Sequence, residues 1–269
     1  MRAILKYPGS KWSTADWIIS NFPKHHTYIE PYFGSGAVLF NKKISAIETV
    51  NDLDDEVVNL FNCIKKDSDR LARLISLTPY SRKEYDNSFI AQENDEFEKA
   101  LRFLVRCWQG HGFRTNGYKV GWKNDVQGRE NMYAAYNWYR LPEWIAGIVD
   151  RLKQVQIDCQ PAIKFIKRHK YQNVLIYADP PYLLSTRSGK QYKHEMNEQD
   201  HIELLELLIE HPGPVIISGY QSEIYDEMLT GWNKKTTKGM AEYFGEDRNE
   251  VIWMNYEPPN EQISFDTAI

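Results

Sequence analysis

Four consecutive residues, Asp179, Pro180, Pro181 and Tyr182, follow an apolar segment at 173–178 that reads as a buried strand. In open α/β sheets, ligands bind beyond the carboxyl ends of the strands, which is where this tetrapeptide falls. The Asp179 carboxylate and the Pro180 carbonyl can accept hydrogen bonds from one amino group, and the two prolines stiffen the turn. Tyr182 offers a flat face for a nucleobase. The tetrapeptide predicts a site that orients an aromatic amine such as adenine N6, although a lone Asp-Pro-Pro is as readily a simple turn.

Three other motifs stand where such a site would need them. After the first predicted strand, Glu30-Pro-Tyr-Phe-Gly-Ser-Gly36 places two glycines so that the chain can turn closely into a helix. After the second strand, Asn51-Asp-Leu-Asp54 places carboxylates where Rossmann-like domains bind ribose. Near the start, Lys6-Tyr-Pro-Gly-Ser-Lys11 combines cations, an aromatic ring and a tight turn. Each motif alone also fits a plain turn, and Asp54 equally fits a helix N-cap.

Alternating strand and helix patterns must position these motifs. Apolar, β-branched runs predict strands, and periodic apolar residues predict helices between them. This alternation predicts an α/β fold with a mostly parallel, Rossmann-like sheet. The strands are expected at 27–30, 47–51, 155–158, 174–178, 215–218 and 251–255, and the helices at 13–21, 56–65, 162–169, 198–210 and 222–230.

The alternation fails between residues 55 and 154, which read mainly as helix and loop. A helical stretch at 93–109 precedes a glycine-rich loop, and a further helix pair is expected around 133–152. Residues 100–140 hold seven Lys or Arg against two acids, a local charge of +5 in a chain whose formal net charge is −4. We therefore predict a catalytic domain at 1–54 and 155–269 and a basic, mainly helical insertion at 55–154.

Composition excludes several other classes of protein. The 269 residues are 42% hydrophobic and 26% charged, which is typical of an ordered chain rather than a disordered one. No apolar run reaches the roughly 20 residues that span a bilayer, so we expect a cytoplasmic protein that does not bind membranes. The three cysteines lack ligand spacing, and no metal site is expected.

Read in order, the four motifs give a specific resemblance. The sequence resembles the Dam-like family of N6-adenine DNA methyltransferases, which run from an N-terminal cofactor motif through Phe-x-Gly-x-Gly and an inserted target-recognition region to Asp-Pro-Pro-Tyr. The match covers nearly the whole chain. It implies methyl transfer from S-adenosylmethionine to adenine N6 in double-stranded DNA, and an antiparallel strand at 250–255. Pairing with a restriction endonuclease, action alone and oligomeric state are left open.

The resemblance also implies residue roles. The expected catalytic residues are those of the tetrapeptide, in which Asp179 also lies near the cofactor. The remaining expected cofactor contacts are Tyr7, Pro8, Gly9, Lys11, Glu30, Pro31, Phe33, Gly34, Ser35, Gly36, Asp52 and Asp158. In many relatives an acid follows the third strand by a few residues, whereas Pro161 stands there in this chain.

Basic residues in two loops are the predicted DNA contacts, because Arg and Asn can read guanine and adenine in the major groove. They are Arg114, Asn116, Lys119, Lys123, Arg187 and Lys190. Residues 183–194, which are basic, are expected to close over the flipped base or its phosphates. Family members that read GATC continue differently after their Arg-x-Asn, so the target sequence is expected to differ.

Two other functions remain compatible with the sequence. A related tetrapeptide presents amide and amine nucleophiles generally, so RNA or a protein amide is an alternative acceptor. A catalytically inactive DNA-binding relative is the other alternative. His201 could suggest a general base, but its place at the start of a helix favours a structural role.

Overall fold

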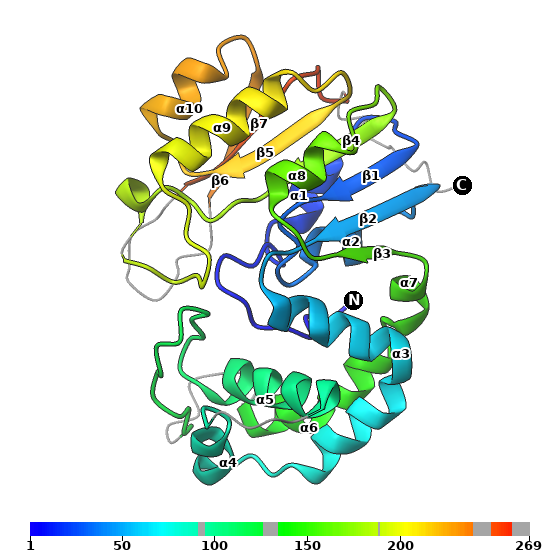
Figure 1. Cartoon of the computed structure of the whole chain (residues 1–269), viewed down its shortest axis with the longest axis vertical. Coiled ribbons are helices and arrows are strands. Elements are labelled where there is room, and N and C mark those ends of the chain that lie inside the picture. Colours follow the sequence, from blue (N-terminus) through cyan, green and yellow to red (C-terminus); the bar gives the residue numbers. More distant parts are fainter. Residues whose placement is uncertain (91–94, 126–133, 188, 239–248, 260–269) are drawn as a thin grey trace, which may run out of the picture.

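The chain forms a seven-stranded sheet within the part that the computed structural model describes, residues 1–90, 95–125, 134–187, 189–238 and 249–259. The strand order is β3-β2-β1-β4-β5-β7-β6. β1 to β5 pair with one another in parallel, and β7 is antiparallel to both β5 and β6 (Figure 1). The prediction of a mostly parallel sheet with an antiparallel C-terminal strand is confirmed. The strands are β1 (Thr27–Glu30), β2 (Ile47–Asn51), β3 (Gln156–Asp158), β4 (Val174–Ala178), β5 (Val215–Gly219), β6 (Asn233–Lys238) and β7 (Asn249–Met254).

The edge strand β6 is the strand that the sequence did not predict. Its sequence, Asn-Lys-Lys-Thr-Thr-Lys, has no apolar alternation, because the strand lies at the end of the sheet and pairs with β7. Lysines on an edge strand discourage pairing with another chain. The lysines that deprive β6 of an apolar pattern are therefore suited to an edge strand.

Helices cover both faces of the sheet. Side chains alternate along each strand: Leu175 and Tyr177 of β4 belong to one core cluster, and Val174 and Ile176 to the other. The first cluster includes residues of α1 (Ala15–Ser20) and α2 (Ala37–Asn41), and the second includes residues of α8 (Ala162–Lys167), α9 (Glu198–Ile209) and α10 (Glu223–Met228). Both faces are buried, as expected for parallel strands joined by helices.

Between β2 and β3 the chain forms five helices within its described residues. They are α3 (Asp55–Leu77), α4 (Arg82–Asn87), α5 (Glu96–Gln109), α6 (Ala134–Ala146) and α7 (Val149–Lys153). The long α3 bends at Asp67 and packs against α5 and α6. The Asp54 side chain accepts a hydrogen bond from the Glu56 amide, so it caps α3. Residues 93, 94 and 133, which the helical predictions included, lie outside the described residues.

The topology brings three loops together. β1 lies between β2 and β4, so the direction in which the sheet grows reverses there. Ligands of open α/β sheets bind at such a switch point, beyond the carboxyl ends of the strands. The loops that follow β1, β2 and β4 carry three of the four predicted motifs. Among the described helices, none has the length and apolar character to span a membrane.

Candidate active site

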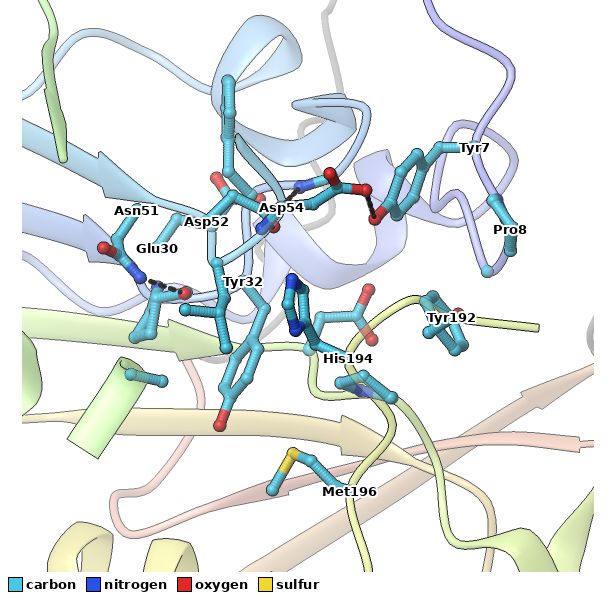
Figure 2. Close-up of a pocket in the computed structure, with 18 of the residues that line it drawn as sticks. Tyr7, Pro8, Glu30, Tyr32, Asn51, Asp52, Asp54, Tyr192, His194 and Met196 are labelled. Atoms are coloured by element: carbon cyan, nitrogen blue, oxygen red, sulfur yellow. Dashed lines mark hydrogen bonds between the residues drawn. The ribbon is translucent and has the colours of Figure 1, made fainter. Parts of the chain in front are cut away.

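A cavity of about 490 Å³ lies beyond the carboxyl ends of β1, β2 and β4. It brings together residues from all four predicted motifs (Figure 2). Most of the predicted catalytic and cofactor-binding residues line it: Tyr7, Pro8, Gly9, Lys11, Glu30, Pro31, Phe33, Gly34, Ser35, Asp52, Asp179 and Pro181.

Four predicted residues do not line the cavity. Gly36 is the N-cap of α2, and Pro180 and Tyr182 are buried beside Asp179. The Asp158 carboxylate instead accepts hydrogen bonds from the Cys159 amide and the Gln160 side chain. The cavity wall nearest to β3 is formed by residues 161–163.

The glycines of the loop after β1 are required by its geometry. Gly34 has a φ of +48° and Gly36 a φ of +68°, a region that side chains with a β-carbon rarely adopt. A β-carbon on Gly36 would lie 2.7 Å from the Phe33 ring, and one on Gly34 would lie 3.2 Å from the Tyr7 ring. The loop therefore passes close to Tyr7 and leaves the cavity open.

The Asp52 carboxylate ties the loops after β1 and β2 together. Its two oxygens accept hydrogen bonds from the Gly34 amide at 2.7 Å and the Asp54 amide at 2.9 Å. Burial raises the pKa of Asp52 to about 6 in spite of these hydrogen bonds. The Tyr7 hydroxyl donates to Asp54 at 3.4 Å. The cavity is thus acidic where the loop after β1 meets the loop after β2.

Another part of the cavity wall holds a lysine between two carboxylates. Lys11 Nζ lies 2.9 Å from Asp179 Oδ2 and 3.2 Å from Glu250 Oε1, and it donates to the Gly9 carbonyl. Burial lowers the pKa of Lys11, but the charges of Asp179 and Glu250 together raise it by more, so that the pKa lies well above its ordinary value. Lys11 is therefore a buried ammonium group that holds Asp179 in place.

Asp179 keeps one oxygen for another partner. Its Oδ1 is buried and makes no hydrogen bond within the described part of the chain. The nearby Tyr182 hydroxyl directs its proton to Glu250 instead. Burial raises the pKa of Asp179 to about 6, while the charge of Lys11 lowers it and that of Glu250 raises it. Asp179 therefore presents an acceptor whose charge is lost in mildly acidic solution.

Glu250 is a site residue that sequence reasoning did not identify. It lies on β7 and is 7% exposed. The available signal was an acid at the start of the apolar run Val-Ile-Trp-Met. Tyr182, which Glu250 anchors, is 9% exposed, with Lys11 over its ring at 4.8 Å and Tyr220 against its edge. The predicted stacking of a base on Tyr182 stays a prediction.

Residues 190–196 form a segment, here called the strap, that supplies one wall of the cavity. Tyr192 lies 6.2 Å from Tyr7 between ring centroids, and a β-carbon on Gly9 would collide with its hydroxyl. Figure 2 shows His194 pointing from the strap toward Asp54. The segment predicted to close, residues 183–194, includes the lining residues Tyr192, Lys193 and His194, whereas Glu195 and Met196 lie beyond it.

Other lining residues were not among the predicted catalytic or cofactor-binding residues. They adjoin the motifs or come from helices and strands that pass the cavity. They are Ser10, Tyr32, Ala37, Val38, Asn51, Leu53, Asp54, Pro161, Ala162, Ile163, Tyr177, Asp200 and Glu203. His201, by contrast, is fully buried and hydrogen bonds to the Tyr225 hydroxyl at 2.9 Å, outside the cavity lining.

The six predicted DNA contacts lie in two environments. Arg114, Lys119 and Lys190 are exposed, with Lys119 ion-paired to Asp86. Lys123 is 9% exposed. Asn116 is exposed but donates to the Lys190 carbonyl, and the Arg187 side chain is 7% exposed and paired with Glu195. Among the described residues, no group of three His, Cys, Asp or Glu side chains is arranged to hold a metal ion.

Comparison with known proteins points to one enzyme family. Residues 7–241 match the family described as D12 class N6 adenine-specific DNA methyltransferase. The chain is 26% identical to the type II methyltransferase M.MjaIII of Methanocaldococcus jannaschii, over 95% of this chain and 99% of that protein. It is also 26% identical to the DNA adenine methylase of Escherichia coli K12, over 85% of this chain and 82% of the relative. The type II methyltransferase M.FokI of Planomicrobium okeanokoites shares 26% identity over 87% of this chain and 38% of that protein.

Proposed function

Since the chain belongs to the D12 class of N6 adenine-specific DNA methyltransferases, we propose that its cavity binds S-adenosylmethionine beside Asp179 and that Asp179 holds the target adenine. The family makes the chain a site-specific DNA methyltransferase that uses this methyl donor. It favours DNA over RNA or a protein amide as the acceptor.

One observation carries the assignment of Asp179. Its carboxylate is fixed by Lys11 through one oxygen, the other oxygen is buried and unpartnered within the described residues, and the residue itself lines the cavity. A buried acceptor without a donor is costly, so such an atom indicates a ligand. The exocyclic amine of adenine is a donor of the right kind.

The cavity fits S-adenosylmethionine in size and chemistry. Its volume of about 490 Å³ lies in the range of small-molecule sites. Asp52, at the carboxyl end of β2, stands where Rossmann-like folds hold ribose hydroxyls. Gly34 lets the backbone approach, because a β-carbon there would press on Tyr7. Tyr7, Lys11, Glu30 and Phe33 would complete the walls around the donor.

The protein contributes orientation and electrostatics to the reaction. Bound S-adenosylmethionine supplies a methyl group on a positively charged sulfur. The nitrogen lone pair of adenine is delocalised into its ring, so the amine must be held with that lone pair directed at the methyl carbon. Asp179 and the Pro180 carbonyl would accept the two N6 hydrogens, favouring the charge that builds on nitrogen. Lys11 keeps the Asp179 carboxylate in place throughout.

The insertion at 55–154 is the proposed target-recognition region, and the target adenine would leave the helix to reach Asp179. Arg114, Lys119 and Lys190 are exposed and basic, as phosphate or base contacts require. We propose that the enzyme acts in the cytoplasm, where its DNA is accessible. Pairing with a restriction endonuclease and action alone stay the two open alternatives.

The decisive experiment incubates unmethylated DNA with the enzyme and labelled S-adenosylmethionine, and then digests the DNA to nucleosides. The label should appear in N6-methyldeoxyadenosine. Asp179→Ala should lower its rate of formation by at least about 10²-fold, the cost of removing one transition-state hydrogen-bonding partner. Circular dichroism must show that the variant is folded. A folded Asp179→Ala enzyme with normal turnover would remove Asp179 from the chemistry.

A further inference from the structure

Thr115 is a buried residue in a mostly exposed loop. Residues 110–123, here called the recognition loop, include exposed residues on both sides of Thr115, whereas Thr115 itself is 8% exposed. It is buried against the strap. Its amide donates to the Gln191 carbonyl at 2.8 Å, and its hydroxyl accepts from the Lys193 amide at 2.7 Å. Next to it, Asn116 donates to the Lys190 carbonyl at 2.9 Å.

The recognition loop is also held by contacts with the rest of the insertion. An antiparallel bridge between Gly110 and Trp122 closes its base. The Tyr85 hydroxyl, from α4, donates to the Val120 carbonyl at 2.7 Å. The Tyr80 hydroxyl donates to the Lys123 carbonyl at 2.8 Å. A displacement of the recognition loop would therefore also displace the strap, to which it is hydrogen bonded.

The strap is in turn connected to the catalytic tetrapeptide. Glu195 accepts hydrogen bonds from the Gln191 and Tyr192 amides and pairs with Arg187. Arg187 Nε donates to the Tyr182 carbonyl at 2.7 Å. Hydrogen bonds thus run without a break from the recognition loop, over the cavity, to Tyr182. In Figure 1 the loop between α5 and α6 reaches the segment that precedes α9.

We propose that Thr115 is a positioning residue that couples DNA recognition to closure of the strap over the cofactor cavity. This inference rests on the proposed function. DNA that holds the recognition loop in place also holds Tyr192 and Glu195 against the cavity, so DNA and cofactor each strengthen binding of the other. Coupling of this kind is reciprocal by thermodynamic linkage.

Calorimetry tests the coupling directly. The dissociation constant of S-adenosylhomocysteine is measured for the free enzyme and with a saturating short duplex that contains the methylated sequence. The ratio of the two constants is the coupling factor, which is independent of how tightly the DNA itself binds. For the unaltered enzyme, the duplex should tighten binding about tenfold, within the usual range of such couplings.

Thr115→Val removes the hydroxyl, which faces both the Lys193 amide and the Tyr7 side chain, but keeps the size of the side chain and the amide bond to Gln191. It should lower the coupling factor about fivefold, the effect of one hydrogen bond. Thr115→Ser, which keeps the hydroxyl, should retain the coupling. The matched control is Thr78→Val, which removes a hydroxyl bonded to the Leu74 carbonyl at the end of α3. It should also retain the coupling.

If Thr115→Val does not fold, Asn116→Ala removes the neighbouring bond to the strap and should lower the coupling factor in the same direction. A folded Thr115→Val enzyme with the full coupling factor would overturn the inference and leave the proposed function standing. So would an unaltered enzyme that binds S-adenosylhomocysteine equally with and without DNA. If the unaltered enzyme did not bind S-adenosylhomocysteine at all, the proposed cofactor site would fall, and the inference with it.

Discussion

Two buried lysines, Lys42 and Lys11, stand in ion clusters of opposite composition. Glu48 lies between Lys42 and Arg151, so one carboxylate faces two cations. Lys11 lies between Asp179 and Glu250, so one cation faces two carboxylates. The first cluster joins α2, β2 and α7 away from the cavity, and the second forms part of the cavity wall. Similar burial therefore serves different purposes in the two places.

The difference appears in the two carboxylates. Both Glu48 oxygens have partners: Lys42, the Ser45 amide and Arg151. Burial raises the pKa of Glu48, but the hydrogen bonds from Arg151 and Lys42 together lower it by more, so the net shift of the pKa is downward. The pKa of Asp179 is instead raised to about 6, and one of its oxygens is unpartnered within the described residues. A carboxylate with partners on both oxygens, such as Glu48, stabilises the fold, whereas the unpartnered Asp179 oxygen is free to accept a hydrogen bond from a ligand.

The largest effect on stability is expected for Glu48→Gln. It leaves two buried cations without a counter-charge, which should lower the free energy of unfolding by about 3–5 kcal/mol. Urea denaturation at neutral pH measures this. Glu143→Gln is the matched control, because Glu143 pairs with Arg140 on the exposed surface and its loss should change little. Equal losses in the two variants would show that the Glu48 cluster is not a stabilising centre.

Asp179→Asn should have the opposite signature. The asparagine amide has one neutral acceptor oxygen in place of two charged ones, so the turnover number should fall by about 10²–10³-fold. The free energy of unfolding at pH 7.5 should stay the same or rise, because a buried carboxylate with a raised pKa is disfavoured in its charged form. Kinetics and urea denaturation of the same sample give both values. A large loss of stability would place Asp179 with Glu48 as a structural residue.

The pH dependence should separate the two clusters. Asp179 must be ionised to accept from N6, so the turnover number should fall as the pH drops through about 6. For stability the signs differ. The raised pKa of Asp179 gives stability that is full below its unfolded value and is lost as the pH rises through about 6. The lowered pKa of Glu48 gives stability that is present above its unfolded value and is lost as the pH falls through the folded value.

Saturating S-adenosylmethionine and DNA make this measurement specific to the chemical step. Asp52 also has a pKa of about 6, but it would act on cofactor binding and so on KM. A turnover number that stays constant from pH 8 to pH 5 would show that the charge of Asp179 is not needed.

The sequence predicted most of the sheet because the apolar runs of β1, β2, β4 and β5 are buried on both faces. It predicted the cavity motifs because residues at the carboxyl ends of neighbouring parallel strands must meet. It did not predict β6, whose edge position requires no apolar pattern. It placed Arg187 among the DNA contacts because charge alone does not distinguish a surface cation from one that pairs with Glu195.

Glu250 shows the same limit most clearly, since its partners Lys11 and Tyr182 are far from it in sequence and meet it only when β7 pairs with β5. That placement gives the smallest and sharpest prediction. Glu250→Gln keeps an acceptor for Tyr182 but removes the charge that raises the pKa of Asp179. The acid limb of the turnover profile should therefore move to lower pH, with little change in rate at pH 8. Glu223→Gln, at an exposed position on α10, should leave the profile in place. If Glu250→Gln shifted the acid limb to higher pH or not at all, the charge of Glu250 would not raise the pKa of Asp179. The difference between the Lys11 and Lys42 clusters would then depend on Asp179 alone.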